Sequence, residues 1–263
     1  MSRMIHRVVD SALPLELMGS PANSTKVSEI DVILTTSATA GNRTPQLELR
    51  ASTKQICAMA NWQKAAYNAL KDKLNADTGV KDTDYAAVST AAATSLTTAY
   101  ALLNAIKAAL NTLHAKLDLD AGVALTVYAA QVAISSADST TPATAITLAN
   151  EILVNLRRLC NLLDGESTVA DEDYESTIMA GAAGCHPPAL TTSSTKNASA
   201  ATTASKTAVR HRFSTAVTDG NGTGYVNTAI TEYTIPIGAC IAVNIATPVD
   251  ATNDKVTIDV SFI

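Results

Sequence analysis

Cys185-His186 is the pair of adjacent side chains in this sequence that could most readily take part in catalysis or metal binding. A cysteine beside a histidine can serve as a nucleophile or as part of a metal site, because imidazole accepts the thiol proton and both side chains bind zinc. No third ligand lies at a suitable spacing, and Pro187 and Pro188 follow directly, which favours a bend in the chain. We interpret the pair as structural. A hydrolase whose site assembles from distant residues stays open as an alternative.

Two further histidines could bind a ligand or a partner. His114 lies beside Leu113 in a segment with helical apolar spacing, so a packing or surface role is the simpler interpretation. His211 is flanked by Arg210 and Arg212, which is typical of one face of an exposed strand. Contact of that face with an anion or a partner is the alternative.

An acidic group and a glycine-rich segment are the remaining candidates. The carboxylates between Asp171 and Glu175 could bind Ca²⁺, but they lack the spacing of a calcium loop, which favours a solvated surface. Residues 219–224 (DGNGTG) resemble a phosphate loop but lack its Lys-Ser/Thr, and the following segment is not helical in pattern, which favours a hairpin turn. We therefore assign no catalytic, cofactor-binding or metal-binding residue, and we predict that the chain is not an enzyme.

The composition narrows the class of protein. The chain has 263 residues, a formal net charge of −5 and only 4% aromatic residues, with alanine, serine and threonine abundant. No basic surface large enough for nucleic acid is evident, and no apolar run reaches the roughly 18 residues of a membrane span. The four cysteines form no C-x-x-C pair, which indicates reduced, buried thiols. The start of the chain lacks the pattern of a secretory signal, so we expect synthesis and use without export by the usual route.

The segments that must position these residues change in character along the chain. Alternating apolar residues predict strands at 4–9, 13–18, 26–34 and 44–50, the last two as a hairpin, and again at 209–217, 225–235, 240–246 and 255–263. The Ser/Thr/Ala-rich segment 191–207 is either a flexible strap or an edge strand.

Between these ends the apolar period is helical. Helices are predicted from Ser52 to about residue 75, over 85–117, over 123–134, and from Pro142 to Leu163 with an N-cap before the proline. The seam of the 85–117 helix is apolar throughout, so that helix must find partners along its whole length. The short link between the first two helices predicts an antiparallel pair.

Strands at both ends and helices in the middle predict an α+β fold. Residues 1–52 and 187–263 would form one discontinuous, antiparallel β-sandwich domain, and residues 53–186 an inserted α-helical bundle or hairpin with a linker. Two separate β domains would each have too few strands to close a core.

Two segments carry a resemblance to a known family. Residues 29–50 (EIDVILTTSATAGNRTPQLELR) resemble the opening hairpin of structural proteins of tailed-bacteriophage virions. Residues 233–244 (YTIPIGACIAVN) and 251–260 (ATNDKVTIDV) are similar to the closing strands of the same proteins. The resemblance implies a jelly-roll-like sandwich and a structural role, and it transfers no active residues. The helical segment departs from that pattern.

The resemblance and the composition together predict a virion component made in the host cytoplasm. The leading hypothesis is a capsid decoration or head-associated protein that binds the major capsid protein or other virion proteins and stabilises the shell. A homo-oligomer is expected, with a trimer as the favoured number, and neither nucleic acid nor membrane as a partner. A tail, collar or fibre component that binds a host receptor is the alternative.

Overall fold

The computed structural model describes residues 45–82, 84–171, 173–179 and 187–198 continuously, and separate strands elsewhere. The chain divides into two compact units. The first comprises Met1–Ser52 and Ser193–Ile263, and the second comprises Thr53–Thr192. The sequence-based prediction ended the inserted domain at residue 186.

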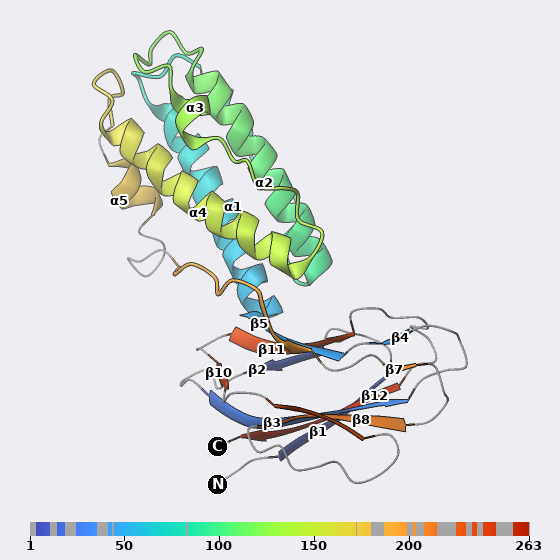
Figure 1. Cartoon of the computed structure of the whole chain (residues 1–263). Helices are drawn as coiled ribbons and strands as arrows, with labels where there is room; N and C mark the ends of the chain where they lie inside the picture. Colours follow the sequence, from blue (N-terminus) through green and yellow to red (C-terminus); the bar gives the residue numbers. More distant parts are fainter. Residues whose placement is uncertain are drawn as a thin grey trace. The chain divides into compact units, whose positions relative to one another are not determined.

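The described part of the first unit consists of strands, which Figure 1 shows together with their labels. Their bounds are β1 Met4–Asp10, β2 Leu15–Met18, β3 Thr25–Thr35, β4 Asn42–Arg43, β5 Pro45–Ala51, β6 Ser194–Ala198, β7 Thr202–Thr203, β8 Ala208–Ser214, β9 Tyr225–Ala229, β10 Tyr233–Ile235, β11 Ala239–Ile245 and β12 Lys255–Phe262. One sheet has the order β1-β12-β3-β8-β9, with β10 also paired to β3. A second has the order β2-β11-β5-β6, and β4 pairs with β7.

The predicted fold class, an antiparallel jelly-roll-like β-sandwich, is wrong. Helices make up about half of the residues whose side chains are described, and within that part of the chain the only strands described together over several adjacent residues are the antiparallel pair β5 and β11. The described backbone also contains a parallel pair, because β8 and β9 run in the same direction. An alternating pattern identifies a strand, but it does not specify the direction or identity of its partner.

The predicted hairpin between residues 26–34 and 44–50 is wrong for the same reason. β3 pairs with β12, β8 and β10, whereas β5 pairs with β11 and β6, so these two strands lie in different sheets. The segment 191–207 was predicted as a strap or an edge strand. Its residues Ser194–Ala198 form β6, which is the last strand of its sheet in the described chain.

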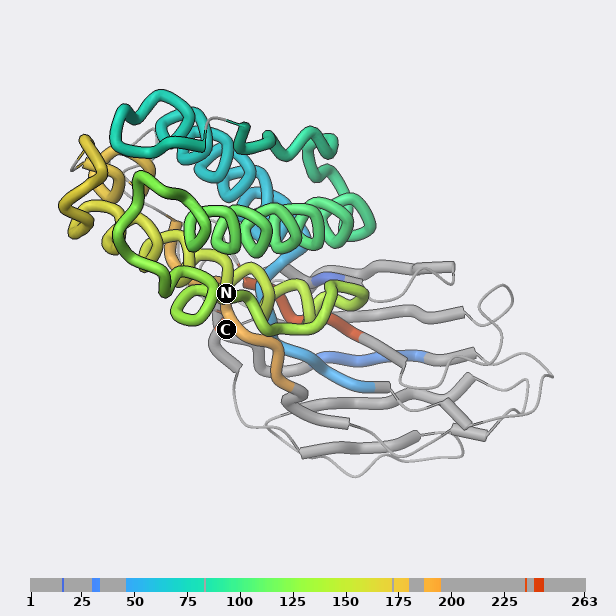
Figure 2. Tube along the Cα trace, turned by 90° about the horizontal axis from the view of Figure 1, so that it is seen from above, coloured from blue at the N-terminus to red at the C-terminus, as the bar shows by residue number. Residues whose placement is uncertain are grey.

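The second unit is built on three long helices. They are α1 Thr53–Ala76, α2 Leu96–Leu117 and α4 Pro142–Asp164, and the one-turn helices α3 Tyr128–Val132 and α5 Tyr174–Ile178 lie between and after them. The two views in Figures 1 and 2 show the long helices side by side, and each contacts the other two. No helix among the described residues is both long enough and apolar enough to span a bilayer.

The predicted helix over 85–117 is only partly right. Its C-terminal part is α2, but residues 85–94 are extended, and helix begins only after Ser95, whose side chain accepts from the N–H of Thr98 in a capping box. The predicted helix over 123–134 shrinks to α3. The predicted N-cap before Pro142 is confirmed, with Thr141 accepting from the N–H of Thr144. In both capped helices, local side-chain chemistry fixes the start better than the apolar period does.

The antiparallel arrangement predicted for the first two helices is also wrong. We call residues 85–94 strap 1 and residues 133–140 strap 2. Strap 1 runs back along α1, with Tyr85 bonded to Asn75 near the end of that helix and Ala93 bonded to Asn61 near its start. α2 therefore begins beside the start of α1, and the two helices run parallel. Strap 2 returns along α2 in the same way, so α4 is parallel to both.

The apolar seam predicted for α2 is confirmed as a buried surface, but its partners belong to the same chain. The three helices pack on one another and bury residues at matching positions, counted from the start of each helix. These buried sets are Gln63, Ile106 and Ile152; Tyr67, Leu110 and Leu156; Leu70, Leu113 and Leu159; and Leu74, Leu117 and Leu163. The seam of α2 needs no neighbouring subunit to cover it.

Candidate functional site

Several of the candidates from the sequence cannot be placed. Cys185-His186 and residues 219–224 lie outside the described residues. His211 lies on β8, where only the backbone is described. The candidate site must therefore be built from the helical unit, where the acidic group and His114 do have a described environment.

The helical unit is an internal repeat. α1, α2 and α4 begin at Thr53, Leu96 and Pro142, so the repeats start at intervals of 43 and 46 residues. We name residues 53–95, 96–141 and 142–190 repeats 1, 2 and 3. Matching positions carry the same or related residues: Asn61, Asn104 and Asn150; Asn75, Asp118 and Asp164; Asp77, Asp120 and Glu166; Tyr85, Tyr128 and Tyr174. The apolar pattern of each helix does not reveal this period, whereas the polar residues do.

Asparagine side chains on the helices hold the straps. Oδ1 of Asn61 accepts from the N–H of Ala93 at 2.7 Å, and its Nδ2 donates to the carbonyl of the same residue at 3.0 Å. The same two-way pairing joins Asn68 to Val88, Asn75 to Tyr85, Asn104 to Ser139, Asn111 to Ile134 and Asn150 to Leu190. A primary amide carries both a donor and an acceptor, so each asparagine replaces one rung of a β-ladder for an extended segment.

Replacing Asn61 with alanine should lower the free energy of unfolding by about 2 kcal/mol, because the N–H and carbonyl of the buried Ala93 lose their partner. Urea denaturation followed by the helical circular dichroism signal measures the change. Asn161, exposed on α4, supplies the control, and its alanine variant should change stability by less than about 0.5 kcal/mol. Equal effects of the two variants would contradict the role of the asparagine in holding strap 1.

Three carboxylates link the loops that follow the helices, and we call Asp77, Asp120 and Glu166 the clamp carboxylates. Asp120 of repeat 2 accepts from the N–H groups of Lys81 and Asp82 in repeat 1. Glu166 of repeat 3 accepts from the N–H of Leu125 in repeat 2 at 2.9 Å. Asp77 of repeat 1 accepts from the N–H groups of Ala170 and Asp171 in repeat 3. Each repeat thus binds one neighbour, and the three links close a ring.

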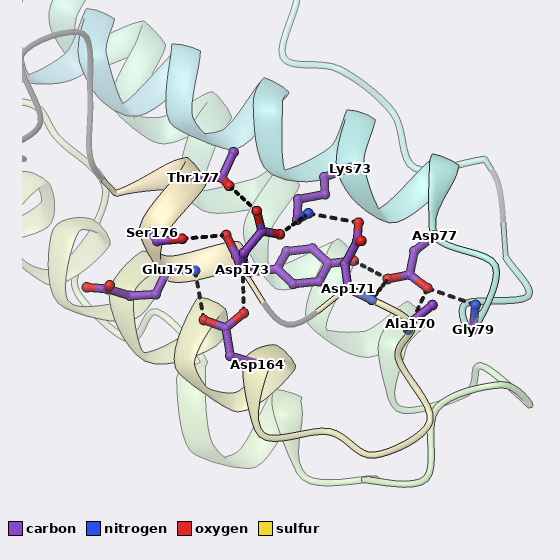
Figure 3. Close-up of polar contacts among 11 residues, drawn as sticks. Lys73, Asp77, Gly79, Asp164, Ala170, Asp171, Asp173, Glu175, Ser176 and Thr177 are labelled. Carbon is purple, nitrogen blue, oxygen red and sulfur yellow. Dashed lines mark hydrogen bonds and ion pairs between the residues drawn. The ribbon is translucent and has the colours of Figure 1, made fainter.

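At the junction of repeats 1 and 3 the clamp carboxylate also binds a tyrosine hydroxyl (Figure 3). Asp77 is 5% exposed and accepts four hydrogen bonds, from the N–H groups of Gly79, Ala170 and Asp171 at 2.8, 3.0 and 3.1 Å and from the hydroxyl of Tyr174 at 2.9 Å. Burial opposes ionisation, but these hydrogen bonds outweigh it and lower the pKa of Asp77 below its usual value. The carboxylate is therefore ionised and fully engaged.

Lysine side chains brace two of the junctions. Nζ of Lys73 lies 4.7 Å from the centroid of the Tyr174 ring and bonds Asp171 and Asp173 at 2.8 and 2.6 Å. The matching residue of repeat 2, Lys116, lies over the Tyr85 ring and pairs with Asp82 and Asp84. At the third junction the matching positions are Leu162, Leu125 and Val127. At the junction of repeats 2 and 3, apolar residues thus take the place of both the lysine and the two aspartates.

The acidic group predicted as a solvated surface, with Ca²⁺ as the alternative, belongs to this junction. Asp171 and Asp173 face Lys73, and Oδ2 of Asp173 also accepts from the hydroxyl of Thr177. Among the described residues no three His, Cys, Asp or Glu side chains are grouped closely enough to hold a metal ion. The hydrogen bonds and ion pairs of these aspartates connect repeat 3 to repeat 1.

His114 is completely buried on α2, and neither ring nitrogen has a hydrogen-bond partner among the described residues. Burial lowers its pKa to about 4, although the negative charge of Asp118 acts in the opposite direction. The packing role predicted from the sequence fits this environment. The histidine is held neutral at pH 7.

The neutral His114 makes stability depend on pH. The unfolded chain binds a proton near pH 6.5 and the folded chain only near pH 4, so stability is complete above pH 6.5 and falls as the pH drops toward 4. The loss attributable to His114 is about 3 kcal/mol. Replacing His114 with leucine should abolish this part of the loss, which urea denaturation of both proteins at pH 7 and pH 4 measures. An unchanged difference between the two pH values would show that His114 is not the group responsible.

Comparison with known proteins adds no relative, since no family model, no curated protein and no solved structure matches this chain.

Proposed function

We propose that the chain is a non-enzymatic structural component of a tailed-bacteriophage virion, a capsid decoration or head-associated protein that stabilises the shell by packing against it. The segments that resemble virion proteins, residues 29–50, 233–244 and 251–260, belong to the first unit. That unit would bind the major capsid protein or a neighbouring copy.

The observation that carries the proposal is the closed construction of the helical unit. The chain enters it at Thr53 and leaves it after Leu190, which Asn150 holds near the start of α4, so both connections lie at one end of the parallel bundle. The other end consists of three loops joined by the clamp carboxylates. A rigid module attached at one end suits a protein that adds mass and contacts to an assembly.

Because the bundle is closed, an oligomer would not form through the apolar seam of α2. The seam of α2 is covered by α1 and α4 of the same chain, so the trimer that we propose would assemble through other surfaces. Analytical ultracentrifugation of the purified chain measures its oligomeric state. A monomer at all concentrations, with no affinity for capsids, would contradict both the oligomer and the proposed placement.

Immunogold electron microscopy of intact virions provides the direct test. Antibodies raised against the whole chain should label heads, and the same antibodies pre-absorbed with the chain should label nothing. Labelled tails or fibres would replace the decoration role with the receptor-binding alternative. Unlabelled virions would overturn the proposal. Hydrolase activity that disappears in both Cys185→Ala and His186→Ala would also overturn it.

A further inference from the structure

A cavity of about 330 Å³ lies between α1, α2 and the start of strap 1. Six of the residues that line it are Tyr67, Tyr85, Ala87, Ala108, Ala109 and Leu113. Its walls are thus largely methyl groups and aromatic rings, and its one ion pair, between Lys116 and Asp84, is satisfied internally. Asp84, Tyr85 and Lys116 line it from the junction of repeats 1 and 2.

The other two repeats show what occupies the matching position. In repeats 2 and 3 the residue that matches Tyr85 begins a one-turn helix, α3 at Tyr128 and α5 at Tyr174. α3 contacts α2 and α4, and α5 contacts α4 and α1. Between the remaining pair of helices, α1 and α2, the described residues 77–82 and 84–95 form no such turn, and the cavity lies there.

The sequence explains the missing turn. Residues 128–134 read YAAQVAI, and strap 1 reads YAAV over residues 85–88, so the tripeptide Gln-Val-Ala is absent from repeat 1. The helical turns place Val132 and Ile178 in buried positions, at 0% and 4% exposure. Repeat 1 therefore lacks one aliphatic side chain that both of its counterparts bury.

The charges around the three positions indicate an uncharged occupant for the cavity. α3 and α5 meet arginines of α4, with Arg158 donating to Gln131 and Arg157 paired with Glu175. The residue of α2 that matches Arg158 is Thr112, and the residue of α1 that matches Arg157 is Asn68; both are neutral. An occupant of the cavity therefore needs no polar side chain to pair with a charge at these positions.

We propose that this cavity is a docking site for one turn of helix from a partner protein, which inserts a valine or isoleucine where Val132 and Ile178 lie in the other repeats. The partner turn is uncharged on the inserted face and carries small residues beside the aliphatic one, as Ala129 and Ala130 do in α3. The proposal does not depend on the virion assignment.

A peptide of the chain's own residues 126–134, acetylated and amidated, is the probe. Titrated at millimolar concentration into the ¹⁵N-labelled full chain, it should shift the amide resonances of Ala86, Ala87 and Ala109 saturably. The same peptide with aspartate in place of Val132 should bind with an affinity at least about tenfold lower. No saturable shift, or equal binding of the two peptides, would overturn the proposal.

Variants of the chain locate the site. Ala108→Trp covers the cavity from an exposed position and should abolish binding, whereas Ala101→Trp, also exposed on α2 but outside the cavity, should bind as the native chain does. Inserting Gln-Val-Ala between Ala87 and Val88 should close the cavity from within, raising the urea midpoint and abolishing peptide binding. Binding that survives Ala108→Trp or the insertion would show that the peptide binds elsewhere.

Discussion

Replacement of Asp77 with alanine is expected to lower the free energy of unfolding of the helical unit by about 4 kcal/mol. The substitution leaves three backbone N–H groups and the Tyr174 hydroxyl without their acceptor, in a place that water reaches poorly. It also cuts the link between repeats 1 and 3, which closes the ring. Urea denaturation monitored by helical circular dichroism measures the loss.

Asp72 supplies the matched control for this substitution. It lies on the same helix, its side chain is 68% exposed, and it pairs only with the neighbouring Lys71 among the interactions described. Asp72→Ala should change stability by less than about 0.5 kcal/mol. Similar losses in the two variants would mean that Asp77 acts through general helix stability and not through the clamp.

Acid should weaken the clamp in a predictable direction. Burial raises the pKa values of Asp77 and Asp120, but their hydrogen bonds outweigh it and hold both below the usual range. Each carboxylate therefore contributes stability that is present above about pH 4, the value for an unfolded chain. That stability is lost as the pH falls through the lower folded value. In Asp77→Ala the corresponding part of the acid dependence should be missing.

The sequence predicted the long helices well where a capping group and an apolar seam agree. α4 begins after Thr141 and α2 ends at Leu117, as the pattern indicated. The pattern failed over residues 85–94, because Tyr85 and Val88 are buried at a spacing that a helix and an extended strap both allow. Side chains on α1 decide between the two, and their pairing with the strap is not a local property of the strap's own sequence.

Polar residues at a fixed period carry the sequence signal for the candidate site. Asn61 and Asn68 recur as Asn104 and Asn111, and Asp77 and Gly79 recur as Asp120 and Gly122. These matches define a period of 43 residues, which is the sequence signature of a repeat. The direction of the clamp, from each repeat to a specific neighbour, could not have been predicted, because three parallel helices can be ordered in either sense around a common axis.

The strand partners in the first unit could not be predicted from the sequence either, since pairing depends on contacts between distant segments.

Repeat 3 differs from repeats 1 and 2 at one glycine position in the loop after the long helix. Gly79 and Gly122 occupy matching positions, and the residue of repeat 3 at that position is Thr168. The hydroxyl of Thr168 donates to Glu166 and accepts from the N–H of Ala124. A side chain thus supplies a contact to repeat 2 at the junction where Glu166, a longer residue, replaces aspartate.

Gly79→Ala and Gly122→Ala should each destabilise the helical unit by about 4 kcal/mol. A Cβ on Gly79 would lie 2.1 Å from the carbonyl oxygen of Thr168, and one on Gly122 would lie 2.0 Å from the carbonyl oxygen of Gly79. Both obstacles are backbone atoms of the neighbouring repeat, so relief requires the loops to separate and the clamp to open. Urea denaturation of each variant measures the cost.

Gly165 distinguishes this packing effect from a general intolerance of alanine in the loops. It follows α4 with φ of −89°, and a Cβ there would meet its nearest neighbour, the carbonyl oxygen of Asn161, at 3.5 Å. Gly165→Ala should therefore leave stability within about 0.5 kcal/mol of the native chain or raise it slightly, because alanine restricts the unfolded chain. If Gly79→Ala were as well tolerated as Gly165→Ala, the loops of repeats 1 and 3 could not be in close contact. The ring closed by Asp77 would then not be the arrangement that holds the three helices together.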